Sequence, residues 1–128
     1  MTADLGDETE ALSVLRCVLH QLRDRLPIDE SVQFAAQLPM IVRGIYFEGW
    51  QPRRVPDKKV KTRQEFLDAL AVRMLPRRLP PESIAKCVFA ILAHRLDPGE
   101  ISDVIGQLPE DIKGLWPLTA QTFKARLR

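Results

Sequence analysis

The 128 residues are 45% hydrophobic and 28% charged, which fits one compact domain, 1–128. No apolar run approaches the roughly 20 residues that span a bilayer, and two cysteines do not make a disulfide framework. The acidic N-terminus does not resemble a secretory signal, so we expect a cytoplasmic protein. The net charge is +2, but residues 1–50 carry four Lys or Arg against eight Asp or Glu (−4), whereas residues 51–128 carry fifteen against nine (+6), which favours an anionic partner for the second half.

Apolar residues spaced by three and four predict a long helix from Glu8 to about Leu26, which Pro27 ends. A second helix follows, with acidic residues in its first turn, and Pro39 begins a third that Gly49 caps at its C-terminus. Four residues of the second helix are expected to face the core: Val32, Phe34, Ala35 and Leu38.

Residues 51–62 lack apolar periodicity and contain two prolines, so we expect a linker there. Helices are then predicted at 63–75 and 82–96, the latter facing the core with Ile84, Val88, Ile91, Leu92 and Leu96. Asp97 is a favoured N-cap for the next helix, Pro109 opens a short one, and Thr119 is expected to cap the last, at 118–128. No stretch alternates with a period of two, which predicts an all-α fold.

An internal repeat is the clearest feature of the chain. Residues 14–46 align with 84–116 without a gap, and ten of the 33 pairs are identical, against roughly two expected by chance. The identical pairs include Cys17/Cys87, Arg25/Arg95, Glu30/Glu100, Gln37/Gln107 and Pro39/Pro109. A structural unit that has been duplicated is expected to repeat its buried positions and its helix breakers together in this way.

The repeat predicts a bundle of about seven or eight helices, built from two tandem pseudo-symmetric repeats of roughly three to four helices each. Repeat one covers about 7–50, the linker 51–62, repeat two about 63–117, and the C-terminal helix 118–128. The helix at 63–75 precedes repeat two, whereas only Met1–Gly6 stands before repeat one. We therefore expect an uncovered apolar edge on repeat one, a partner chain that fills it, or a native chain that begins further upstream.

Three motifs in the first half are similar to those of a bacterial family catalogued as domain of unknown function 2267. They are His-Gln-Leu-Arg-Asp-Arg-Leu-Pro at 20–27, Ala-Ala-Gln-Leu-Pro-Met at 35–40 and Arg-Gly-Ile-Tyr-Phe-Glu-Gly-Trp at 43–50. The second half resembles the family through residues 107–111 and 115–116. The resemblance covers about residues 11–117 and implies a small helical protein of duplicated build, without implying an activity.

The aromatic segment at 43–50 has two interpretations. Its residues anchor the core between the repeats, or they form a surface that binds a protein partner or a second copy of the chain. Under the second interpretation the candidate partner-binding residues are Arg43, Tyr46 and Trp50.

The linker is basic, and it too has two interpretations: a solvated connection, or contacts to the phosphates of a nucleic acid. The candidate anion-binding residues are Arg53, Arg54, Lys58, Lys59, Lys61 and Arg63. The sequence has no helix-turn-helix recognition pattern to support the second interpretation further.

No catalytic, metal-binding or cofactor signature is present, so we predict a non-enzymatic protein without a cofactor or an evident small-molecule substrate. His20 and His94 are expected on solvated helix faces, and the two cysteines as small buried residues, with a redox pair as the alternative. Capping and salt links between helices account for the repeated Glu30 and Glu100. The leading hypothesis is a protein-interaction module, and the second is a nucleic-acid-binding accessory protein that uses residues 51–63.

Overall fold

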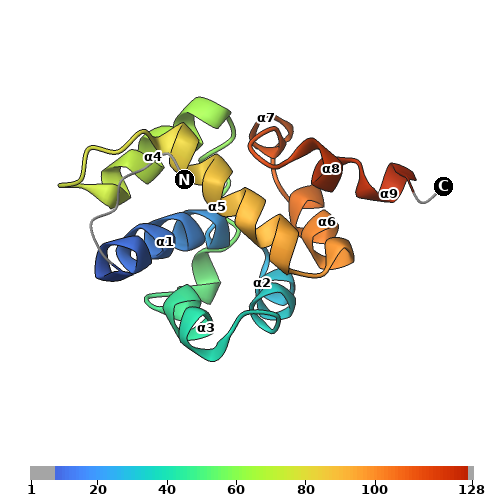
Figure 1. The fold of residues 1–128 in the computed structure, drawn as a ribbon, viewed down its shortest axis with the longest axis horizontal. Helices are drawn as coiled ribbons and strands as arrows, with labels where there is room; N and C mark the ends of the chain where they lie inside the picture. Colours follow the sequence, from blue (N-terminus) through green and yellow to red (C-terminus); the bar gives the residue numbers. More distant parts are fainter. Residues whose placement is uncertain (1–7, 127–128) are drawn as a thin grey trace.

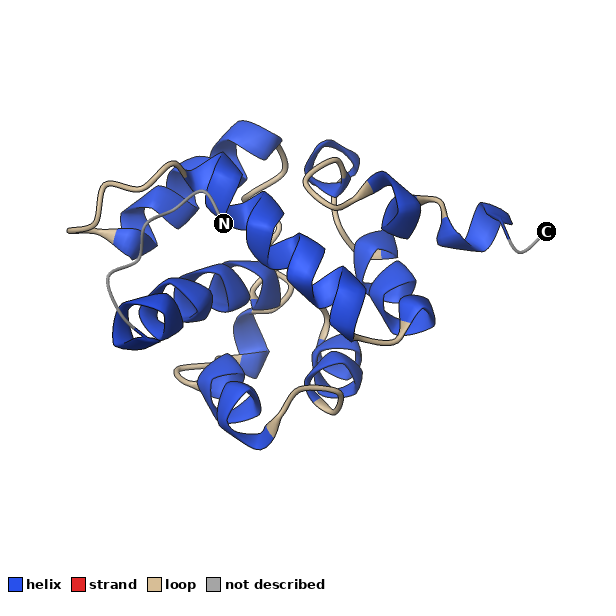
Figure 2. Cartoon of the chain, in the orientation of Figure 1, coloured by secondary structure: helices blue, strands red, loops and turns tan. Residues whose placement is uncertain are grey.

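The computed structural model describes residues 8–126, and over this range it contains helices and no strand, as Figure 2 shows. The all-α prediction is confirmed. The helices are α1 (Glu8–Arg23), α2 (Ile28–Ala35), α3 (Met40–Phe47), the 3₁₀ helix η1 (Pro52–Arg54), α4 (Arg63–Met74), α5 (Pro81–Arg95), α6 (Pro98–Gly106), α7 (Glu110–Lys113), α8 (Leu118–Gln121) and α9 (Phe123–Arg126). None of the helices described is long and apolar enough to cross a membrane.

Most predicted helix ends are confirmed within a few residues. Asp97 caps α6, because its Oδ2 accepts a hydrogen bond from the Glu100 amide at 3.0 Å. Helix α3 ends at Phe47, and Gly49 then adopts the left-handed backbone, with φ of 68°. Helix α1 ends at Arg23, before the expected Leu26, because the amides of Arg25 and Leu26 bond to carbonyls three residues earlier and tighten the chain into a turn.

The prediction for the C-terminal helix is wrong, whereas the linker at 51–62 stays a prediction. The expected single helix at 118–128 is two short helices over its described part, and Pro117, not Thr119, occupies the N-cap of the first. The expected linker contains η1. A capping box that opens α4 was not predicted, although the Thr62-x-x-Glu65 pattern is visible in the sequence: each side chain accepts a hydrogen bond from the other residue's amide at 3.1 Å.

Helix α5 crosses the centre of the molecule, with α1 and α4 to one side and α6 to α9 to the other (Figure 1). Helix α1 packs against α3, α4 and α5, while α2 packs against α6. Large side chains fill the core between them, among them Phe34, Phe66 and Phe89, each fully buried. The rings of Phe89 and Trp116 stack with centroids 4.2 Å apart.

Two apolar residues expected in the core lie largely in solvent. Val32 on α2 is 52% exposed, and so is Ile91 on α5. Both belong to helical stripes that are wider than the neighbouring helices cover. The order long helix, short helix, short helix recurs in α1–α3 and α5–α7, while the pseudo-symmetry of the two units stays a prediction.

Candidate functional site

The aromatic segment lies mainly in the core. Tyr46 is fully buried, its hydroxyl lies 2.8 Å from Ser31 Oγ, and its ring centroid lies 5.5 Å from that of Phe34. Burial raises the pKa of Tyr46. The prediction that Tyr46 lies on a partner-binding surface is therefore wrong, because no atom of its ring is open to a partner in this fold.

Arg43 has a structural role in the same segment. Its Nε donates to the Ala35 carbonyl at 2.9 Å, and its Nη2 donates to the carbonyls of Ala36 and Leu38 at 3.0 and 3.1 Å. These carbonyls lie at the C-terminal end of α2 and in the turn that follows, where backbone acceptors lack helical partners. The guanidinium thus holds the end of α2.

Trp50, like Arg43, stays partly accessible. It is half-buried, its ring lies 5.1 Å from that of Phe47, and its Nε1 has no hydrogen-bond acceptor. Partner binding through Trp50 stays a prediction.

The linker cations do not converge on one point. Arg53, Arg54, Lys58, Lys59 and Lys61 are exposed, whereas Arg63 is the first residue of α4, is half-buried and lies 4.0 Å from Glu82. Of these six, only Arg54 and Lys59 line the adjoining cavity of 690 Å³. The cavity wall also contains Asp24 and Asp57 and two arginines from outside the linker, Arg23 and Arg73. Nucleic-acid binding by this segment stays a prediction.

The histidine and cysteine predictions need correction in part. His20 does not lie on a solvated face: its Nε2 lies 2.6 Å from the Ile45 carbonyl, and burial lowers its pKa. Both cysteines are free and half-buried. The Cys17 thiol donates to the Arg73 carbonyl on α4 at 3.2 Å, whereas Cys87 lines an open groove.

That groove runs between α1 and α5 and has a volume of 220 Å³. We call it the α1–α5 groove. Its lining contains no charged residue: Ala11, Val14, Leu15, Ile84, Cys87, Val88, Ile91 and Leu92. An open apolar surface of this kind is typical of a site that binds another protein segment.

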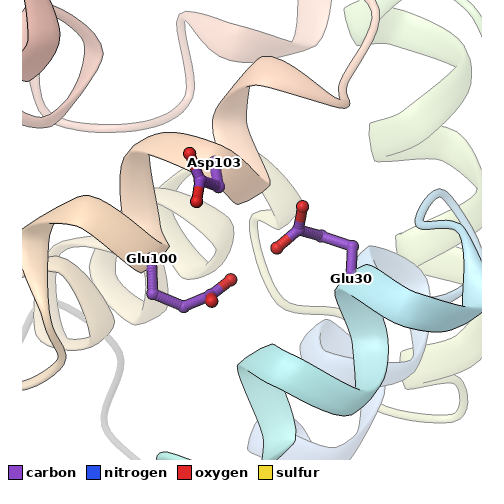
Figure 3. A group of neighbouring side chains, drawn as sticks. All are labelled: Glu30, Glu100 and Asp103. Carbon is purple, nitrogen blue, oxygen red and sulfur yellow. The ribbon is translucent and has the colours of Figure 1, made fainter.

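A second feature lies where α2 packs on α6. Glu30 of α2 and Glu100 and Asp103 of α6 direct their carboxyl groups toward one another (Figure 3), and one oxygen from each lies within 4.8 Å of the other two. We call these three residues the carboxylate seam. Lys124 pairs with it, since its Nζ lies 2.6 Å from Asp103 Oδ1. An arrangement of this kind can share a proton between carboxyl groups or hold a hard cation.

The repeat explains part of the carboxylate seam. Glu30 and Glu100 occupy matching repeat positions, and for this reason the sequence predicted helix capping and salt links for both. Neither forms an ion pair among the residues described, so the predicted salt links are wrong. They face each other instead. Asp103 was missed because its repeat counterpart is Gln33, so no recurrence marked it.

Burial, a hydrogen bond with Glu30 and the nearby charges of Glu30, Asp103 and Asp97 raise the pKa of Glu100 to about 8. A raised carboxyl pKa means that the folded chain keeps a proton which the unfolded chain releases. The stability that this proton brings is therefore lost as pH rises from about 4.5 to about 8.

We predict that Glu100→Gln weakens this pH dependence. In a buffer with a metal chelator, the variant should exceed the unaltered chain in unfolding free energy by about 1–3 kcal/mol at about pH 8.5, because the amide carries no charge among the other carboxylates. Urea unfolding at a series of pH values measures the difference. The control is Glu110→Gln, an exposed carboxyl. Parallel pH curves for the variant and the unaltered chain would contradict the prediction.

Comparison with known protein families places the chain in one of them. A family model described as "Uncharacterized conserved protein (DUF2267)" matches residues 1–115. No curated protein matches the chain. The family match confirms the resemblance seen in the sequence motifs, and its description names no reaction, ligand or partner.

Proposed function

Since the chain belongs to the DUF2267 family, whose description gives no activity, we propose a function from the geometry of the chain. The chain is a non-enzymatic module that binds an amphipathic helix of a partner protein in the α1–α5 groove. The observation that carries this proposal is a groove that none of the residues 8–126 covers and that is lined by apolar side chains alone. Binding of one apolar helix face in a groove of this type is a common mode of peptide recognition.

Helix α4 provides an internal precedent for the occupant. It packs against both α1 and α5 and buries Phe66, Leu67, Leu70 and Met74. On α1, Gln21 Nε2 donates to the Phe66 carbonyl at 3.1 Å and Cys17 Sγ donates to the Arg73 carbonyl. Helix α1 therefore meets α4 through positions 17 and 21.

The repeat relates these two positions of α1 to the open groove. Seventy residues after Cys17 and Gln21 come Cys87 and Ile91, and both line the groove. If the two repeats are related by pseudo-symmetry, a helix that is equivalent to α4 would lie on Cys87 and Ile91. The occupant of the groove is then a helix with an apolar stripe like that of α4.

A helix of a separate partner protein fits the groove better than a helix of a second folded copy of this chain. The apolar face of α4 is already buried against its own α1 and α5. The exposed large apolar residues outside the groove occur singly or as pairs along the chain: Leu12, Ile28 with Val32, Met40 with Ile41, Val72 with Leu75, and Leu118. A helix that fills a groove commonly uses three or four anchors spaced by three or four residues.

The test uses a labelled synthetic peptide of residues 62–75, which carries the α4 stripe, as a surrogate for the partner helix. We predict that it binds the folded chain and that Ile91→Asp weakens this binding at least about tenfold, because the new carboxylate would lose its hydration in an apolar groove. Fluorescence anisotropy measures the affinity. Because Ile91 is 52% exposed, the substitution should alter unfolding free energy by no more than about 0.5 kcal/mol.

Two controls locate the peptide. Ala90→Asp places the same charge on the neighbouring, exposed position of α5, outside the groove, and should leave binding unchanged. Bound peptide should slow the alkylation of Cys87 but not that of Cys17, which already lies under α4. Binding that is equal in the two variants would overturn the proposal. A dimer in light scattering that Ile91→Asp dissociates would show that a second copy occupies the groove, which would also overturn it.

A further inference from the structure

We propose that the carboxylate seam, Glu30, Glu100 and Asp103, is a Ca²⁺-binding site that links α2 to α6. Ca²⁺ takes oxygen ligands at about 2.3–2.6 Å, so two ligands on opposite sides of one ion lie roughly 4.6–5.2 Å apart. One oxygen from each of the three carboxylates lies within 4.8 Å of the others. All three can therefore belong to the ligand shell of a single ion.

The side chain of Glu30 supplies a second, separate observation. It is 8% exposed, and its Oε2 is inaccessible and has no hydrogen-bond donor. Figure 3 shows its carboxyl group directed from α2 toward the two acids of α6. Glu100 Oε2 is also inaccessible and without a partner. A carboxylate oxygen that is removed from water without a donor is costly, and a cation in place of the proton that Glu100 shares with Glu30 would satisfy both oxygens.

Charge favours a divalent ion. When ionised, the three carboxylates carry −3, and the one cation that pairs with them among the side chains of residues 8–125 is Lys124, which leaves −2. Lys124 bonds to Asp103 Oδ1, so Asp103 Oδ2 stays available to an ion. A single divalent cation would balance the remaining charge.

The ligand chemistry selects among divalent ions. Zn²⁺ prefers sites with thiolate or imidazole ligands, and no Cys or His belongs to the carboxylate seam. Mg²⁺ requires shorter bonds and near-octahedral geometry, and it usually keeps several waters. Ca²⁺ accepts irregular carboxylate shells, and for this reason it fits the three side chains best.

The N-termini of α2 and α6 limit the affinity of the carboxylate seam for Ca²⁺. Glu30 and Glu100 are both the third residue of their helices, and the positive ends of the two helix dipoles oppose a cation. Three protein ligands are also fewer than the six to eight oxygens that Ca²⁺ takes, so water must complete the shell. We therefore expect a dissociation constant on the order of 10⁻⁴–10⁻³ M, the range of weak Ca²⁺ modules.

The test begins with chain freed of metal by a chelator and then titrated with CaCl₂ or MgCl₂ at equal ionic strength. We expect CaCl₂ to raise the thermal unfolding midpoint more than MgCl₂ does, and calorimetry to report one Ca²⁺ per chain. Glu100→Gln and Asp103→Asn, both at partly exposed positions, should weaken binding by about tenfold or more. Glu30→Gln should also weaken Ca²⁺ binding if the variant folds. If it does not fold, the two α6 variants alone test the site.

The matched control is Glu110→Gln, which removes an exposed carboxylate outside the carboxylate seam and should bind Ca²⁺ like the unaltered chain. Equal midpoints in CaCl₂ and MgCl₂, no calorimetric signal up to about 10 mM Ca²⁺, or unchanged binding in both α6 variants would each overturn the proposal. The site does not depend on the α1–α5 groove, so Ile91→Asp should leave Ca²⁺ binding unchanged.

Discussion

Tyr46→Ala is expected to lower the free energy of unfolding by about 3–5 kcal/mol, the range for removing a large aromatic side chain from a core. The ring is fully buried and contacts the rings of Phe34 and Phe47, with centroids 5.5 and 5.2 Å away. Removing it leaves a cavity between α2 and α3 and takes the hydroxyl away from Ser31. Urea unfolding followed by circular dichroism measures the loss.

A graded comparison separates the ring from its hydroxyl. Tyr46→Phe keeps the ring and should cost only about 0.5–1.5 kcal/mol, because it removes one hydrogen bond. Trp50→Ala, at a half-buried position of the same segment, should cost less than Tyr46→Ala. If Tyr46→Ala were as stable as the unaltered chain, the ring would not be a core element. Tyr46→Phe decides the question where the alanine variant does not fold, since it should fold and lose the smaller amount.

Arg43→Ala is expected to lower the free energy of unfolding by about 2–3 kcal/mol. Three carbonyls at the end of α2 lose their guanidinium donor, and a hydrogen bond to a charged group contributes about 1.5–3 kcal/mol. The loss should fall short of a sum over three bonds, because Arg43 is an exposed residue and water can replace part of the donation. The same unfolding measurement applies.

Two substitutions sharpen the interpretation of Arg43. Arg43→Lys keeps the charge but lacks the planar fork, so it should recover only part of the loss. Arg53→Ala, at an exposed arginine of η1, should change stability by no more than about 0.5 kcal/mol. Full recovery by lysine would show that charge, rather than the geometry of the donors, holds the end of α2.

Both predictions concern residues for which the sequence left two interpretations open. Residues 43–50 combine aromatic and charged side chains, and a helical period alone does not say which face of the helix is covered. Tyr46 lies under α2, whereas Trp50 follows the end of α3 and stays half-exposed. The difference arises from the turn after Phe47, where Gly49 changes the direction of the chain.

The α1–α5 groove shows the same limit. The apolar stripe of α5 predicted that Ile91 would face the core, yet Ile91 is 52% exposed. Of the predicted stripe only Ile84 and Leu92 are buried, the buried Phe89 was missed, and no helix among the described residues covers Ile91. Sequence periodicity counts the apolar positions, and only packing shows which of them another helix covers.

The sequence by itself determined the local structure: the helical period, the proline and glycine breaks, the Asp97 cap and the recurrence of one glutamate at positions 30 and 100. These features depend on residues within a few positions of one another, so a single chain carries them. Only the tertiary structure decided that α2 packs on α6, which brings Glu30, Glu100 and Asp103 together. That contact joins residues about 70 positions apart, and it depends on which faces the whole set of helices buries.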